Sequence, residues 1–293
     1  MTQPINNCLK ISQLFKIDKF YHMLFKENCL LCEGKIDDLQ PQDRKGLPHL
    51  TKPVNWQVKC EGSSPQNIPA KAGYSYVKTN IHAVCAACLN DLLWHPELSC
   101  PQCGLESDGN ICGSCLSSPP DFDRTLAVFL YSFPIDAMMV RYKYGNMLNL
   151  GNTFGQFLAE KTTLEALNHN HVDLIIPMPM HPARIRERGF NQAHEIAKVL
   201  TKNCKERLDF KSVARTKLTP PQASLPLKDR VKNIKGAFKI NGDLAGNLKG
   251  RRIAIVDDVM TTGASLNELA KTLKKAGASH VECWVVARTL PPK

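Results

Sequence analysis

Apolar and polar residues alternate in blocks along the last two-thirds of the chain, and these blocks predict strands and helices in turn. The run 253–256 is entirely apolar, which is typical of a strand buried on both faces of a sheet. The segment 191–201 instead carries apolar residues three or four positions apart, as on one face of a helix. The predicted strands are 126–133, 172–179, 211–215, part of 231–240, 253–256 and 281–287, and the predicted helices are 134–141, 150–167, 191–201 and 265–276. Strands separated by helices favour an α/β fold with a parallel sheet, in which ligands bind at the carboxyl ends of the strands.

The first part of the chain is rich in cysteine and has no such alternation. The chain has 12 cysteines, and eight of them form four Cys-x-x-Cys pairs: Cys29/Cys32, Cys85/Cys88, Cys100/Cys103 and Cys112/Cys115. A single pair could be a redox motif, but four closely spaced pairs are typical of zinc knuckles. Because tetrahedral zinc takes four thiolates, the eight cysteines predict two structural zinc sites, and neither His82 nor His95 is needed as a ligand.

The two halves of this cysteine-rich part differ in the length of chain between the pairs. Cys100/Cys103 and Cys112/Cys115 are separated by a loop of hairpin size, so we expect them to share one metal. The first two pairs would then share the other, across the polar, proline-containing insert 33–84. We therefore expect an N-terminal segment 1–28, a double zinc ribbon over 29–116 and an α/β domain over 117–293.

Net charge and hydropathy limit the class of partner. The formal charge is +11 and the pI is about 9.1, which favours anionic partners such as nucleotides, pyrophosphate or nucleic acid. The N-terminus lacks a charged-then-apolar signal pattern, and no segment approaches the roughly 20 apolar residues of a membrane span. A cytoplasmic protein is the expectation.

Two carboxylates and a small-residue turn follow the apolar run 253–256. Asp257 and Asp258 come first, and Thr261, Thr262, Gly263, Ala264 and Ser265 then lead into the predicted helix. Backbone N–H groups of such a turn and of a helix N-terminus bind phosphate, whereas carboxylates bind sugar hydroxyls or Mg²⁺. The segment therefore predicts a site for a phosphorylated sugar. The alternative is an ordinary α/β strand end with a capped helix.

Two further polar segments are candidates for the same site. Arg184, Arg186 and Arg188 follow the strand 172–179 and suit bidentate binding of a polyanion, while Gly189 allows a sharp turn and Asn191 can cap the next helix. The segment 215–233 has three prolines and no clear period, and could close over a bound polyphosphate. A solvated basic loop and a plain surface loop are the respective alternatives.

Taken together, the motifs resemble two known families. The segment 256–264, Val-Asp-Asp-Val-Met-Thr-Thr-Gly-Ala, resembles the phosphoribosyl pyrophosphate (PRPP) motif of type I phosphoribosyltransferases. The whole chain resembles the ComF family, which places a double zinc ribbon before a phosphoribosyltransferase-like domain. That resemblance rests on the cysteine pairs, that motif and the segments 177–182, 186–192, 219–222 and 232–238. The insert 33–84 is longer than is usual in the family.

The resemblance implies particular roles and a reaction. Asp257 and Asp258 would hold the ribose hydroxyls with Mg²⁺ nearby, the residues 261–265 would bind the 5′-phosphate, and Arg184 would meet pyrophosphate. The reaction implied is Mg-dependent transfer of the phosphoribosyl group to an acceptor that the sequence leaves open. Thr261 stands where hypoxanthine-type transferases have an acidic base, which disfavours such substrates. The alternative is a non-catalytic, PRPP-responsive zinc protein that binds single-stranded DNA or works with the competence machinery.

Overall fold

The computed structural model describes residues 29–31, 84, 88–89, 91–145, 147–166, 172–202, 207–218 and 233–291. The chain divides into two compact units, one of residues 1–51 with 82–91 and one of residues 52–81 with 92–293. The expected N-terminal segment 1–28 lies outside the described residues, as does the insert 33–84 except for residue 84.

The described part of the first unit is a small cysteine-containing fragment. Cys29 is buried, and its Sγ accepts a hydrogen bond from the backbone N–H of Leu31 at 3.4 Å. The N–H of Asp91 donates to the carbonyl of Cys88 at 3.2 Å. Backbone N–H groups near cysteine sulfur are what a knuckle loop provides.

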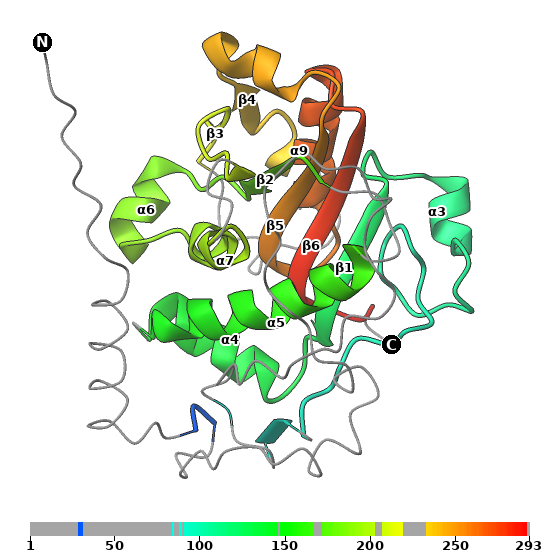
Figure 1. The fold of residues 1–293 in the computed structure, drawn as a ribbon, viewed down its shortest axis with the longest axis vertical. Helices are drawn as coiled ribbons and strands as arrows, with labels where there is room; N and C mark the ends of the chain where they lie inside the picture. The colour runs from blue at the N-terminus through cyan, green and yellow to red at the C-terminus, as the bar shows by residue number, and fades with distance from the viewer. Residues whose placement is uncertain are drawn as a thin grey trace, which may run out of the picture. The chain divides into compact units, whose positions relative to one another are not determined.

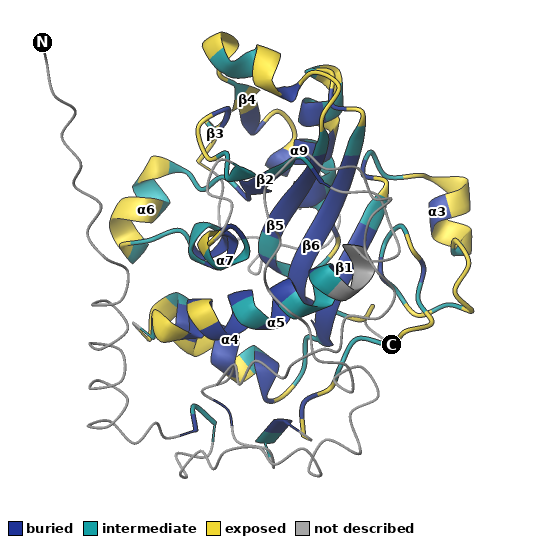
Figure 2. Ribbon diagram, in the orientation of Figure 1, coloured by how far each residue is buried: buried dark blue, intermediate teal, exposed yellow. Residues whose placement is uncertain are grey.

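The second unit is built on a four-stranded parallel sheet (Figure 1). Its strands are β1 (Arg124–Leu130), β6 (His280–Arg288), β5 (Arg252–Met260) and β2 (Leu174–Pro177), in that spatial order. The two central strands carry the longest buried runs, and Figure 2 shows them almost wholly buried. The strands predicted from apolar runs are thereby confirmed, and the fold is of the parallel α/β type.

Helices cover both faces of this sheet. α5 (Asn149–Ala166) contacts β1 and β6, and α7 (Gln192–Leu200) contacts α5, β2 and β5, so these two helices pack side by side. α9 (Ala264–Lys275) packs on the opposite face (Figure 1), where its leucines join β5 and β6 residues in one apolar core. Each buried leucine contributes roughly 1.5–3 kcal/mol to folding. The core thus fixes both ends of β5 relative to α9.

The remaining elements are short and lie around the sheet. They are α3 (Gly113–Ser117), α4 (Ile135–Tyr144), α6 (Pro182–Arg188), the 3-10 helix η6 (Gly242–Leu248), and the antiparallel strands β3 (Val213–Arg215) and β4 (Phe238–Ile240). None of the described helices is long and apolar enough to cross a membrane.

The outer edge of β1 is closed by the segment that precedes the cysteine loop. The N–H of His95 donates to Val128 and the N–H of Leu130 donates to Leu93, so residues 93–95 pair with β1 as a short antiparallel strand. The Trp94 ring packs at 4.8 Å from the ring of Phe129. Because the edge is paired, β1 does not present free backbone groups along this stretch.

Candidate phosphate and metal sites

The acidic pair lies inside strand β5, which corrects the prediction that both residues follow the strand. The β5–β6 ladder continues to the pair Met260↔Arg288, whereas β2 pairs with β5 only as far as Val256. Asp257 and Asp258 are therefore held by β6 on one side and face the loop after β2 on the other. The strand outlasts its apolar run because its partner strand continues beside it, and a carboxyl end of the sheet is where parallel folds bind ligands.

Both carboxylates lie near basic groups. Successive residues of a strand point to opposite faces. Asp258 is buried and its Oδ2 lies 3.0 Å from Nζ of Lys143, at the C-terminal end of α4. Burial alone lowers the pKa of Lys143, but attraction to Asp258 more than offsets this and raises the pKa overall. Arg215, at the end of β3, acts electrostatically on Asp257.

Asp257 is the group whose ionisation differs most from that of a free carboxyl. Burial, followed by repulsion from Asp258, raises the pKa of Asp257 to about 7, although the positive charges of Lys143 and Arg215 oppose this. Oδ1 of Asp257 accepts the N–H of Asp258 at 2.9 Å, which fixes the carboxyl against its own strand. A cation or a set of hydroxyl donors placed here would favour the charged form.

The turn after β5 has the geometry of a phosphate cradle. Residues 261–263 form bends, and Gly263 adopts a left-handed conformation with φ 77° directly before α9. A Cβ at this glycine would lie 2.8 Å from Cε of Met260, so the turn needs glycine for space as well as for conformation. Oγ1 of Thr262 accepts the N–H of Ala264 at 3.3 Å. The N–H groups of the first turn of a helix point along its axis and suit an anion.

The arginine segment after β2 forms a short helix, α6, and not an irregular loop. His181 caps α6 by accepting the N–H of Ala183 at 3.2 Å, and Gly189 ends the helix with φ 87°. Arg184 and Arg188 are four residues apart and share one face, whereas Arg186 points elsewhere and is exposed. The three arginines therefore do not all face one ligand. The predicted cap of the next helix is confirmed, because Oδ1 of Asn191 accepts the N–H of Ala193 at 3.1 Å.

α6 and α4 approach one another through their last residues. The guanidinium of Arg188 lies 5.2 Å from the centre of the Tyr144 ring and donates to its hydroxyl at 3.5 Å. Arg184 forms an ion pair at 2.6 Å with Glu187 on its own helix, and it acts electrostatically on Arg215. Lys143 and Arg215 thus supply basic groups at the acidic pair, while Arg184 lies near Arg215 and Arg188 contacts Tyr144. The predicted closing segment 215–233 lies outside the described residues between 219 and 232.

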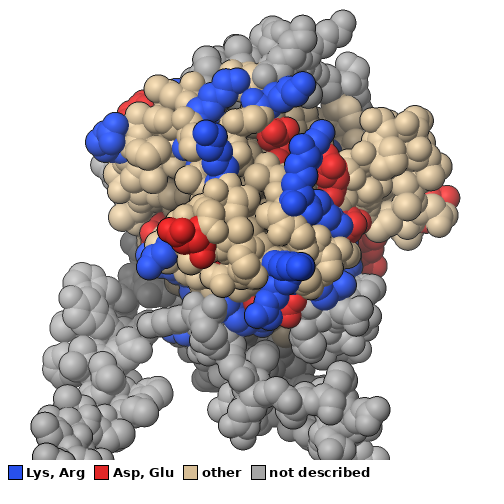
Figure 3. Space-filling view, turned by 90° about the horizontal axis from the view of Figure 1, so that it is seen from above, with Lys and Arg blue, Asp and Glu red and all other residues tan. Residues whose placement is uncertain are grey.

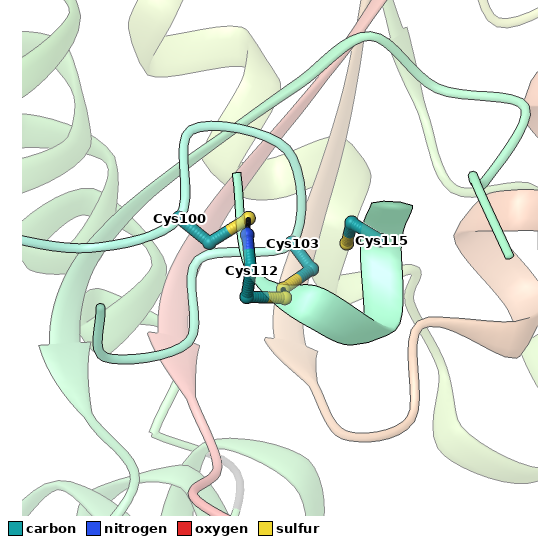
Figure 4. A group of neighbouring side chains, drawn as sticks. All are labelled: Cys100, Cys103, Cys112 and Cys115. Atoms are coloured by element: carbon teal, nitrogen blue, oxygen red, sulfur yellow. Dashed lines mark hydrogen bonds between the residues drawn. The ribbon is translucent and has the colours of Figure 1, made fainter. Parts of the chain in front are cut away.

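Four cysteines from the loop 100–103 and the segment 112–115 come together in a second cluster. Cys100 and Cys103 lie on one loop, Cys112 caps α3 and Cys115 lies within that helix (Figure 4). Their Sγ atoms lie within 4.8 Å of one another, and those of Cys103 and Cys112 are 3.7 Å apart. Sulfur atoms at 2.3 Å from a tetrahedral zinc are about 3.8 Å apart, so the spacing fits such an ion.

The chemistry of this cluster also fits a cation. Sγ of Cys100 accepts the N–H of Cys112 at 3.3 Å. Burial raises the pKa of the Cys115 thiol strongly, and its neighbours Cys103 and Cys112 raise it further. A divalent ion would reverse this by favouring thiolates. This cluster could hold a metal. Among the cysteines predicted for a second site, Cys29 and Cys88 are described, whereas Cys32 and Cys85 lie outside the described residues.

Two residues near the turn were not identified from the sequence. Lys143 has no motif of its own and reaches Asp258 across 115 positions, which only the packing of α4 on the sheet brings about. Arg288 lies at the end of β6 and is 4% exposed. The signal that was available for Lys143 is its place at the end of a predicted helix, where a basic residue is common.

Basic side chains form no continuous stripe on the face that Figure 3 shows. Seen from above, Lys and Arg lie in several separate groups, with Asp and Glu between them. The excess of positive charge in the whole chain is therefore divided on this face into local groups.

A parallel α/β sheet that ends in an acidic pair and a glycine turn defines a phosphoribosyltransferase-type fold, here carrying a four-cysteine cluster. The phosphoribosyl transferase domain family matches residues 185–290. Competence protein F of Haemophilus influenzae is 31% identical over 225 residues, covering 73% of this chain and 95% of that protein. DNA utilization protein YhgH of Escherichia coli O6:H1 is 32% identical, covering 71% and 91%. Competence protein ComFC of Bacillus subtilis is 24% identical, covering 70% and 84%. The chain therefore belongs to the ComF family.

Proposed function

We propose that this protein binds PRPP together with Mg²⁺ at the end of β5 and transfers the phosphoribosyl group to an acceptor, releasing pyrophosphate. The observation that carries the proposal is one juxtaposition. An acidic pair, the half-buried Asp257 and the buried Asp258, is followed within one turn by Gly263 and the N-terminus of α9. Acceptors for hydroxyl groups and donors for a phosphate thus lie at one end of one strand.

Each group then has a role in binding. The carboxylates of Asp257 and Asp258 accept the ribose hydroxyls, and residues 261–265 bind the 5′-phosphate through backbone N–H and hydroxyl groups. Arg184 and Arg188, on the shared face of α6, suit the pyrophosphate as bidentate donors. Carboxylate oxygens are ligands of the type that Mg²⁺ takes, and the ion would neutralise charge on the departing pyrophosphate.

In the chemical step the protein stabilises charge and supplies no nucleophile. The bond from ribose C1 to the pyrophosphate oxygen breaks, and its electron pair leaves with pyrophosphate. The sugar ring becomes positively charged before the acceptor forms its bond to C1 and loses a proton. The protein holds the two partners in line and stabilises the negative charge that develops. Lys143 is placed to take part, since a ligand hydroxyl on Asp258 would free its ammonium for the anion.

Calorimetric titration with PRPP and MgCl2 tests the proposal. The double substitution Asp257→Asn with Asp258→Asn removes both charged acceptors, and each lost charged hydrogen bond costs roughly 1.5–3 kcal/mol. Affinity should fall at least tenfold. The matched control is Asp243→Asn on the exposed helix η6, which should bind as the unaltered protein does. Equal binding by the double variant would exclude this site.

A second candidate function is binding of single-stranded DNA in response to PRPP. The printed names of the relatives mention competence and DNA utilization, and the chain carries a formal charge of +11. Binding of this kind weakens steeply with salt, with a log–log slope of about −0.7 for each phosphate contacted. Titrating a fluorescent oligonucleotide into the full chain, with and without PRPP, separates the two candidates, because only the second requires PRPP to change DNA affinity.

A further inference from the structure

Arg288 connects the cysteine cluster to the turn after β5. Its Nε donates to the carbonyl of Cys103 at 2.9 Å. Its Nη1 donates to the carbonyls of Met260 at 3.1 Å and Thr289 at 2.8 Å, and also to that of Thr261. One buried guanidinium thus holds a cluster residue on one side and the first residues of the turn on the other.

These contacts determine where the turn directs its N–H groups. In a trans peptide the carbonyl and the following N–H point in opposite directions. The carbonyls of Met260 and Thr261 point towards Arg288, so the N–H groups of Thr261 and Thr262 point away from it. The N–H of Thr289 also donates to Met260, at 3.0 Å, and fixes the same peptide. Arg288 therefore sets the orientation of the donors that begin the phosphate cradle.

The guanidinium of Arg288 is buried, and every hydrogen bond recorded for it goes to a backbone carbonyl. Among the residues that the structure describes, no acidic group lies within ion-pair distance of this guanidinium. Burial of an unpaired charge is costly. Four thiolates around a divalent cation carry a net charge of −2, so a loaded cluster would supply the missing counter-charge.

The cysteine loop is held against the sheet by further bonds. Oγ1 of Thr125 donates to the carbonyl of Gln102 at 2.6 Å, and the N–H of Thr125 donates to Pro101 at 2.9 Å. A Cβ on Gly104 would lie 3.1 Å from Cγ2 of Thr125, so the loop approaches β1 closely. Movement of the loop would therefore displace Thr125 in β1 and Arg288 in β6.

We propose that Arg288 is a positioning residue for the phosphate turn and that metal in the Cys100–Cys115 cluster controls the turn through it. The part that concerns a ligand rests on the proposed function, whereas the mechanical coupling does not. Binding of metal and binding of a phosphorylated sugar then strengthen one another, as reciprocity between two coupled sites requires.

The test measures hydrogen exchange of the amides of residues 261–265 in the full chain, before and after metal removal with a chelator and after reloading with zinc. In the unaltered protein, removal should speed exchange at least tenfold and reloading should restore it. Arg288→Lys keeps the charge but loses the fork of donors, so exchange should already be fast and should respond little to the chelator. The control Arg252→Lys makes the same change at the opposite end of the β5–β6 ladder and should retain the full response.

Amides of β2 serve as the internal reference. If they speed up as much as residues 261–265 do, metal loss unfolds the whole unit and the proposed local role of Arg288 is wrong. An unchanged chelator response in Arg288→Lys would also overturn it. If that variant fails to fold, Thr125→Val removes the bond from Oγ1 to the carbonyl of Gln102 in the same loop, together with the contact of Oγ1 with Sδ of Met260. This variant should give an intermediate response, and a normal response would again overturn the proposal.

A parallel titration with ribose 5-phosphate and MgCl2 separates the two proposals. Metal removal should weaken this binding by the same factor by which bound sugar phosphate raises the affinity for the metal. If the metal-loaded protein binds neither ribose 5-phosphate nor PRPP, the proposed function fails, and the exchange measurement still decides whether Arg288 couples the cluster to the turn.

Discussion

At the scale of single residues, the site is a balance of close charges. Asp258 has a direct ion pair with Lys143, whereas Asp257 is enclosed beside it and titrates near neutrality. In the ligand-free protein the charged form of this carboxyl is disfavoured, which lowers the stability of the fold. A bound cation or hydroxyl donor would favour the charged form. The consequence appears in the pH dependence of folding.

Replacing Asp257 by Asn should stabilise the ligand-free protein more at high pH than at low pH. The folded-state pKa of Asp257 is raised above its unfolded value of about 3.9 to about 7. The unfolded chain therefore ionises first, and the carboxyl lowers stability increasingly as pH rises from about 4 to about 7. The difference between pH 5 and pH 8 corresponds to about 2.6 kcal/mol, so thermal unfolding should show a gain that is about 5–10 °C larger at pH 8 than at pH 5.

The amide keeps the oxygen that accepts the N–H of Asp258, so the strand should stay intact. Asp243→Asn, on an exposed helix, should show no such pH-dependent gain. A gain for Asp257→Asn that is the same at both pH values would contradict the raised pKa.

Some residues of the site could be identified from the sequence and others could not. Asp257, Asp258 and Gly263 stand in one local motif, where the residue types and their spacing are sufficient. Lys143 and Arg288 reach the same place through packing of distant elements, and a lone Lys or Arg has no local pattern that distinguishes it from a solvated one. Long-range side-chain contacts are the part that local reasoning does not supply.

At the scale of elements, the apolar pattern predicted the sheet well and its polar ends poorly. The buried run of β5 was evident, but the strand continues to Met260 because β6 pairs with it. Helix α6 was taken for a loop because it has almost no apolar face; its signals were a cap at His181, a proline in the first turn and Gly189 at the end. Tertiary pairing and capping thus determined what hydropathy could not.

The helical form of α6 makes a specific prediction about its arginines. Arg184→Ala should weaken PRPP binding about tenfold or more, which corresponds to roughly 1.5–3 kcal/mol for a charged hydrogen bond. Arg186→Ala should leave the affinity unchanged, because this residue points away from the shared face of Arg184 and Arg188. Calorimetry with PRPP and MgCl2 measures both. Equal losses in the two variants would favour a loop that can turn either arginine inward.

At the scale of the whole molecule, the cysteine cluster is part of the second compact unit. The cysteine loop is hydrogen-bonded to the sheet through Thr125 of β1 and Arg288 of β6. The domain boundary expected between residues 116 and 117, after the zinc ribbon, stays a prediction. The cluster and the sheet should therefore lose stability together.

We expect elemental analysis of protein purified without chelator to give two zinc ions per chain, since eight cysteines stand in four pairs. Cys112→Ser should remove one equivalent and lower the unfolding temperature of the second unit, because structural metal contributes folding free energy. Cys204→Ser, which lacks the paired spacing, serves as the matched control and should change neither value. A content below one zinc per chain would contradict the assignment.

The strand order β1-β6-β5-β2 has a consequence for how the protein is made on the ribosome. β1 is among the first strands to emerge, yet its neighbour in the sheet is β6, and Asp123 bonds the N–H of Val281 across 158 positions. Until β6 has left the exit tunnel, β1 has no parallel partner and the apolar surfaces of α5 and α7 have no completed sheet to cover. Contacts so distant along the chain form slowly and leave apolar surface exposed meanwhile. Folding of this sheet should therefore be completed only after β6 has been synthesised.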